Sequence, residues 1–195
     1  WIDAAVIRQV NLDLDRTYPE LKVFNHGGEY HEELRGLLFA CAAHRPSIGY
    51  LQGMGFIAAL FLLYMPPEEA FVCLANVLAD HHFPDFLAVD VKRIDRYANA
   101  FERLMARHLP LLYRHLSGIG IDTRLYLVEW WVAVFGTVLP TDCVAVVWDL
   151  LLLEGVSAMA KVTLGILSVL SEELVGESLD RCLFVLTHVE DFVLR

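Results

Sequence analysis

The sequence has no apolar segment long enough to span a membrane, although 56% of its 195 residues are hydrophobic and its mean hydropathy is +0.48. The longest apolar stretch, residues 54–65, has 12 residues and runs directly into Pro66 and Pro67. A membrane-spanning helix needs roughly 20 residues. Charged residues interrupt the next two apolar stretches, at 125–139 and 143–153. We therefore expect these segments to form core helices, with no direct insertion into a membrane.

Basic residues are few and scattered along the sequence. There are 15 Lys and Arg against 25 Asp and Glu, which gives a formal net charge of -10. Proteins that bind nucleic acid use clustered Lys and Arg to neutralise phosphates. The composition therefore argues against nucleic acid, and by the same reasoning it disfavours anionic membrane surfaces. The classes of binding partner that remain are another protein and a small ligand.

Several chemical signatures are also missing. The four cysteines form no CxxC pair, which is typical of free thiols in a reducing compartment, and no signal peptide is visible. His81 and His82, near Asp80 and Asp85, make a poor metal site because adjacent residues point to different sides of a helix. The sequence contains neither a phosphate-binding P-loop nor a nucleophile elbow. We expect no metal and no cofactor of the chain's own.

The periodicity that is present is helical. Apolar residues recur at spacings of three and four, proline and glycine divide the chain at short intervals, and alternating strand patterns are weak. The pattern predicts an all-α fold, a single domain of about nine or more helices with no significant sheet. A connector is expected over 81–90. The predicted helices cover residues 6–14, 30–44, 54–65, 70–78, 94–108, 110–116, 125–137, 141–153, 156–174 and 179–186.

A first candidate motif lies at the end of the first predicted helix, in residues 10–17. Asp13 and Arg16 are three residues apart, so they can share one helix face and pair. Arg16 lies close to the helix end and could project past it. Taken alone, this spacing is typical of an ordinary solvated salt bridge.

A second candidate motif is the glycine-bracketed segment 48–56. Its glycines flank Tyr50 and Gln52 directly before an apolar helix. Glycine permits tight backbone, as loops that present a side chain often need. Taken alone, the segment is more typical of an ordinary helix entry in which Gln52 meets backbone groups.

Together the two motifs resemble a known family. V-x-x-D-x-x-R-T followed by Y-x-Q-G-M is similar to the paired signature of the TBC domain, the GTPase-activating family for Rab proteins. Further similarity follows in R-P-S-I-G-Y before the second motif, L-Y-L before Trp130, Leu139-Pro140, V-W-D and E-G. The resemblance covers essentially the whole chain. Since the family domain usually has a further helical segment before its arginine motif, we expect residues 1–195 to be a TBC domain lacking that first segment.

The resemblance implies how the chain acts. Arg16 would be an arginine finger and Gln52 a glutamine finger, both supplied in trans to a Rab-family GTPase in its GTP-bound state. GTP and magnesium would be carried by the partner, and the protein would be an activator at cytoplasmic endomembrane surfaces. Residues expected to support the two fingers are Asp13, Thr17, Tyr50 and Gly53, with Asp13 orienting Arg16, Tyr50 shaping the loop and Gly53 allowing close approach.

Two alternatives stay open at this point. The chain could capture an active Rab as a non-catalytic effector or scaffold, or it could be a structural helical domain with no GTPase partner. Both catalytic motifs are unsubstituted, which favours the activator. The protein is then an enzyme activator and not an enzyme with a substrate of its own.

Overall fold

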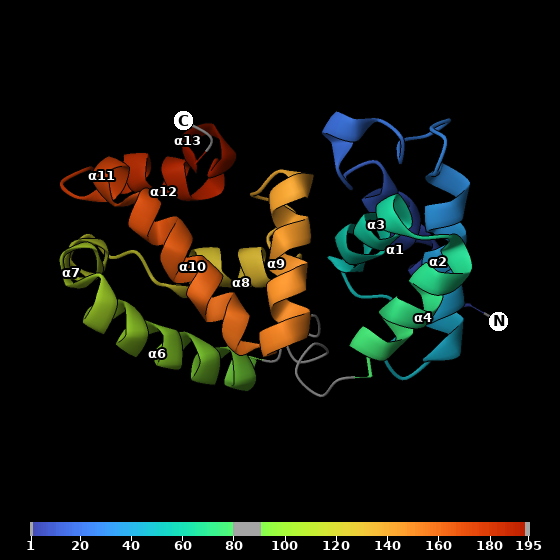
Figure 1. The fold of residues 1–195 in the computed structure, drawn as a ribbon, viewed down its shortest axis with the longest axis horizontal. Helices are drawn as coiled ribbons and strands as arrows, with labels where there is room; N and C mark the ends of the chain where they lie inside the picture. Colours follow the sequence, from blue (N-terminus) through green and yellow to red (C-terminus); the bar gives the residue numbers. More distant parts are fainter. Residues whose placement is uncertain (1, 80–90, 194–195) are drawn as a thin grey trace. The chain divides into compact units, whose positions relative to one another are not determined.

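The computed structural model describes residues 2–79 and 91–193, which contain twelve α-helices and no strand (Figure 1). The prediction of an all-α fold is confirmed. The chain divides into two compact units, residues 1–88 and 89–195. The predicted connector at 81–90 and the histidine pair, His81 and His82, lie outside the described residues.

The first unit is built around an apolar central helix. Helix α3 is apolar on all sides, so neighbouring helices must cover it. Helix α2 packs against α1, α3 and α4, and the shared core includes Leu34, Leu38 and Ile57. The helices of this unit are α1 (Ala4–Leu14), α2 (His31–His44), α3 (Met54–Tyr64) and α4 (Pro67–Val77), with a short 3-10 helix at Pro19–Leu21.

The second unit is organised around buried tryptophans. Trp130 is completely buried and donates through Nε1 to the Leu186 carbonyl at 3.2 Å, and Trp131 Nε1 donates to Thr163 Oγ1 at 2.8 Å. Both indole N–H groups are therefore satisfied inside an aromatic core. The helices of this unit are α6 (Val91–His108), α7 (Pro110–Gly118), α8 (Arg124–Val132), α9 (Thr141–Glu154), α10 (Ser157–Val169), α11 (Ser171–Leu174), α12 (Leu179–Thr187) and α13 (Glu190–Val193).

Two predicted helices were too long. Helix α8 ends at Val132 and not at 137, because Val134 and Phe135 adopt positive φ values of 48° and 63°, which no α-helix contains. Both side chains are fully buried, so core packing holds this unusual backbone in place. The predicted helix 156–174 is interrupted at Leu170, which separates α10 from α11.

Within residues 2–79 and 91–193, no helix is both long and apolar enough to cross a membrane. In the same part of the chain, no cluster of three or more His, Cys, Asp or Glu side chains is arranged to hold a metal ion.

Candidate functional site

Arg16 lies just beyond the C-terminal end of α1, where the chain leaves the helix. Its side chain is 60% exposed, yet its Nη2 donates to Asp13 Oδ1 at 2.6 Å and its Nε donates to the Leu12 carbonyl at 3.1 Å. A long side chain that is anchored at two points loses less conformational entropy when it binds a ligand. The exposed guanidinium is therefore already held in one place.

Asp13 is the buried end of this arrangement, with a side chain only 9% exposed. Its carboxylate accepts from three sources: the Arg16 guanidinium, Gln9 Nε2 at 3.2 and 3.3 Å, and the Tyr50 hydroxyl at 2.9 Å. A buried carboxylate is stable only when it is paired and hydrogen-bonded, and all three contacts serve that requirement. Gln9 lies one helical turn before Asp13 on α1 and was missed from the sequence, although its i,i+4 spacing was visible.

Tyr50 joins the two sequence motifs across 37 residues. Its side chain is buried, and it donates to Asp13 Oδ2 from the loop that precedes α3. Burial, the negative charge of Asp13 and the hydrogen bond to that carboxylate all raise the pKa of Tyr50 far above its ordinary value. The hydroxyl therefore remains protonated, and remains a donor to Asp13, throughout the physiological pH range.

Gln52 follows Tyr50 by two residues and is exposed. Gly53 then adopts a φ of 97°, a left-handed backbone conformation that residues other than glycine rarely adopt. The turn places Gln52 two residues before Met54, the first residue of α3. The two motifs are thus connected by the Asp13–Tyr50 hydrogen bond, with Arg16 exposed at one end and the Gln52 loop at the other.

Gly55 provides the space in which the two motifs meet. A Cβ atom at this position would lie 2.8 Å from Thr17 Oγ1 and 3.6 Å from the Tyr50 hydroxyl. The Thr17 hydroxyl in turn donates to the Asp13 carbonyl at 2.8 Å. The glycine was visible in the sequence, but its role was not, because only the fold shows what it faces.

Tyr18 fixes the chain directly after Arg16 and Thr17. It is a non-glycine residue with φ 43°, and its ring packs edge-on against Phe56 of α3, with 5.2 Å between the ring centroids. A left-handed conformation costs an ordinary residue about 1–2 kcal/mol. Packing in the core of this unit offsets that strain and holds the turn that carries Arg16 against α3.

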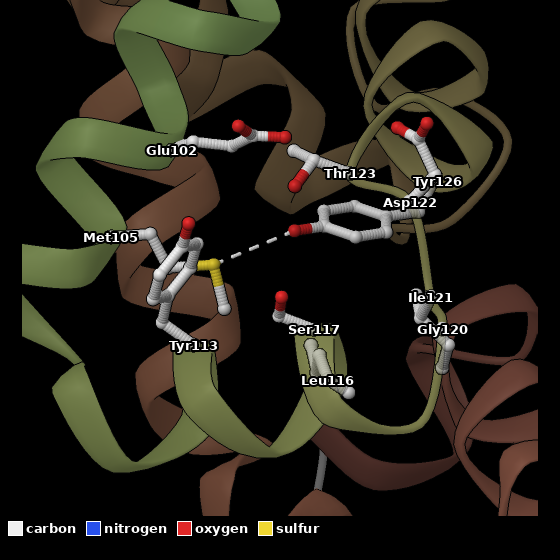
Figure 2. A pocket seen from close by; sticks show the side chains of 10 residues that line it. All are labelled: Glu102, Met105, Tyr113, Leu116, Ser117, Gly120, Ile121, Asp122, Thr123 and Tyr126. Atoms are coloured by element: carbon white, nitrogen blue, oxygen red, sulfur yellow. Dashed lines mark hydrogen bonds between the residues drawn. The ribbon is translucent and has the colours of Figure 1, made fainter.

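The second unit contains a separate small cavity of about 270 Å³. Figure 2 shows the Tyr126 hydroxyl directed at Met105 Sδ, which lies 3.7 Å away, with Glu102 and Thr123 on the same side of the cavity. Burial raises the pKa of the Tyr126 hydroxyl above its ordinary range. None of the predicted site residues lines this cavity.

Two solved structures share the fold. The crystal structure of the Ypt/Rab-GAP domain of Gyp1p matches with a TM-score of 0.79 at 19% identity, covering 94% of this chain and 66% of that one. The crystal structure of the Chlamydomonas flagellar RabGAP TBC domain matches with a TM-score of 0.80 at 23% identity, covering 95% and 62%. The chain therefore has the helical fold of these GTPase-activating domains.

The sequence comparison gives the family itself: the chain belongs to the Rab-GTPase-TBC domain family, whose family model matches residues 2–175. TBC1 domain family member 12 of Xenopus tropicalis is 36% identical over 163 residues, covering 84% of this chain and 24% of that protein. Drainin of Dictyostelium discoideum is 35% identical over 171 residues, covering 88% and 39%. The chain thus spans well under half the length of these relatives, and the resemblance predicted from the two motifs is confirmed.

Proposed function

We propose that this chain accelerates GTP hydrolysis by a Rab-type small GTPase in its GTP-bound state. The observation that carries the proposal is the state of Arg16: its guanidinium is mostly exposed, while a buried carboxylate fixes its position. An arginine at an ordinary solvated surface has no need of such an anchor.

The chemistry of GTP hydrolysis suits the two exposed side chains. Negative charge on the oxygens of the transferring phosphoryl group must be stabilised, and an arginine supplied in trans contributes roughly 10³- to 10⁵-fold in rate. The amide of Gln52 can accept a hydrogen bond from the attacking water and donate one to the phosphate. Arg16 then acts on the phosphate charge and Gln52 on the water.

The residues beneath the fingers act as supports. Asp13 holds the Arg16 guanidinium, and Tyr50, in the loop of Gln52, donates a hydrogen bond to Asp13. The Thr17 hydroxyl donates to the Asp13 carbonyl at the end of α1. Pre-arranging catalytic groups in this way lowers the reorganisation required in the transition state. Gly53 gives the loop its left-handed turn.

GTP and Mg²⁺ enter this scheme with the partner, so the chain needs no cofactor of its own. The partner would also bring the protein to endomembrane surfaces. Which Rab is recognised depends on surface contacts beyond the two fingers.

The test is phosphate release from a panel of GTP-loaded Rab proteins, measured with wild type, Arg16→Ala and Gln52→Ala. We expect wild type to accelerate at least one Rab and each variant to lose most of that acceleration with an unchanged melting temperature. If the alanine variants are as active as wild type, the two-finger mechanism is wrong. If wild type binds a GTP-loaded Rab and accelerates none, the chain is an effector.

A further inference from the structure

Helix α6 carries a row of basic side chains that the linear sequence conceals. Its 18 residues contain five basic and two acidic residues, in a chain whose formal net charge is -10. Arg96, Arg103 and Arg107 are spaced by seven and four residues, and Lys92 precedes them by four. With 3.6 residues per turn, these four positions fall within about 60° of one another around the helix axis. We name Lys92, Arg96, Arg103 and Arg107 the α6 basic row.

The opposite side of α6 is fixed in the core of its unit. Ile94, Ala98, Phe101 and Met105 are all buried, and α6 packs against α7, α8 and α10. Figure 1 shows α6 along the border of the second unit, with no other helix of that unit beyond it in this view. The basic row is therefore presented outward by a helix that cannot rotate.

The arginines of the row are exposed and have no carboxylate partner among residues 2–79 and 91–193. The two acidic residues of the helix face another neighbour: Arg124 Nε contacts Asp95 Oδ1 at 2.7 Å, and Arg124 Nη1 lies 3.9 Å from Glu102 Oε1. The carboxylates of α6 are thus directed to Arg124, and the positive charge of Arg96, Arg103 and Arg107 has no carboxylate beside it among the described residues.

We propose that the α6 basic row is a contact surface for a membrane leaflet rich in anionic phospholipid. Guanidinium groups pair with phosphate in a bidentate manner, and each basic side chain near an anionic leaflet adds to the attraction. The arginines extend over 11 residues, or roughly 16 Å of helix, along one straight line. Such a convex line fits the flat layer of lipid headgroups.

The composition of the face favours a lipid surface over an acidic protein segment. Protein interfaces usually have an apolar centre surrounded by a polar rim. Between the arginines, this face presents Asn99 and Ala100, and the exposed Leu104 lies about 60° further around the helix than Arg107, outside the row. The contact needs no insertion of α6, whose apolar side remains in the core.

The acidic balance of the whole chain does not prevent this contact. At physiological ionic strength charges are screened over about 8 Å. A leaflet touching the row therefore responds mainly to the row, while acidic groups elsewhere are largely screened. The total charge alone disfavours anionic membrane surfaces, and the uneven distribution of that charge along α6 is the reason to propose this contact. This contact is independent of the proposed function, since it can be measured without any GTPase.

The test is flotation of the purified chain with vesicles of phosphatidylcholine alone or with about 30% phosphatidylserine, at low and high salt. Wild type should bind only the phosphatidylserine vesicles and dissociate at high salt. The variant R96Q/R103Q/R107Q should bind them on the order of 100-fold more weakly. The variant R96K/R103K/R107K, which keeps the charge, should retain most of the binding.

The matched control removes the same charge elsewhere. R8Q/K22Q/R114Q neutralises three other exposed basic residues, and it should bind like wild type if the row is the contact. Melting curves verify that all variants are folded. The proposal would be overturned if R8Q/K22Q/R114Q lost as much vesicle binding as R96Q/R103Q/R107Q. It would also be overturned if wild type showed no preference for phosphatidylserine vesicles. If wild type ignores vesicles but binds polyglutamate through the row, the partner is an acidic protein and the proposal also fails.

Discussion

Arginines are used differently in the two units of this protein. In the first unit Arg16 is held by a buried carboxylate at 2.6 Å and by a backbone carbonyl, although most of its side chain is exposed. In the second unit Arg96, Arg103 and Arg107 extend from α6 with no carboxylate partner among the described residues. Arg16 is arranged for one geometry, whereas the α6 arginines supply charge without a fixed position.

The difference indicates what each surface can recognise. A fixed guanidinium fork can stabilise charge that develops at one defined point, as in a transition state. A row of unrestrained cations attracts any surface of opposite charge and tolerates variation in where that charge lies. Exposure alone does not distinguish the two uses, since both kinds of arginine are exposed. The distinguishing feature is a buried carboxylate partner, which Arg16 has and the α6 arginines lack among the described residues.

The largest effect should come from replacing arginine by lysine at the fixed site. Lysine keeps the charge of Arg16 but loses the planar fork that contacts Asp13 and Leu12. Arg16→Lys should remove most of the roughly 10³- to 10⁵-fold contribution of an arginine finger to GTP hydrolysis. The measurement is phosphate release from the most responsive Rab. The same exchange at Arg103 should leave hydrolysis unchanged, so equal losses at both positions would refute the distinction.

The sequence predicted the helices well where proline or glycine ends them. Pro66 lies between α3 and α4, Pro67 is the first residue of α4, and Gly155 follows α9, as expected from the backbone limits of these residues. The prediction from the sequence was wrong at Val134 and Phe135. These two apolar residues continue the helical pattern of the sequence, but their backbone is not helical. Local pattern cannot reveal a conformation that is imposed by burial among distant residues.

The sequence predicted one of the side-chain contacts in the candidate site and missed the other. Both motifs were recognisable, and the pairing of Asp13 with Arg16 follows from their spacing on α1. The hydrogen bond from Tyr50 to Asp13 crosses 37 residues, so no spacing rule could predict it. The α6 basic row differs in kind: its spacing is regular, but the charge is seen to gather on one face only when the residues are placed around the helix axis.

The second prediction removes the anchor and leaves the arginine. Asp13→Asn replaces a carboxylate that accepts from three donors by an amide with only one acceptor oxygen. Arg16 should then lose its fixed position, and kcat should fall by about 10- to 100-fold, since misplacement by about 1 Å can cost that much. The KM for the GTPase should change little. Asp15→Asn, at an exposed neighbour, is the control, and wild-type kcat in Asp13→Asn would show that Arg16 needs no anchor.

The third prediction closes the space between the two motifs. Gly55→Ala would place a Cβ atom 2.8 Å from Thr17 Oγ1, and overpacking of this kind costs about 1–3 kcal/mol of unfolding free energy. Gly36→Ala, in α2, is the matched control, because a Cβ atom at Gly36 would meet no other atom within 4 Å. This variant should stabilise the chain by about 0.5–1 kcal/mol, since alanine favours a helix more than glycine does. Chemical denaturation measures both. A Gly55→Ala variant as stable as Gly36→Ala would show that the contact with Thr17 is easily relieved.

The fourth prediction concerns pH. Burial and Asp13 raise the pKa of Tyr50 far above the value near 10 that it has in an unfolded chain. Above pH 10 the unfolded chain therefore releases this proton while the folded chain keeps it, so stability is full below pH 10 and falls as the pH rises further. Tyr50→Phe should lower stability at pH 7 by about 1–2 kcal/mol, because Asp13 loses a donor, and should reduce the alkaline loss. Denaturation at pH 7 and pH 10.5 tests both effects.

The smallest effect is expected at the other buried tyrosine of this unit, Tyr18. Its ring packs on Phe56, but its hydroxyl is buried without a hydrogen-bond partner among the described residues. Replacing an unsatisfied hydroxyl by hydrogen removes a desolvation penalty and no hydrogen bond. Tyr18→Phe should therefore be neutral or slightly stabilising at pH 7 in chemical denaturation, and hydrolysis should be unchanged because the ring still holds the turn of Arg16. A loss of stability as large as that of Tyr50→Phe would mean that the Tyr18 hydroxyl has a partner in solution, and that the turn depends on a polar contact as well as on packing.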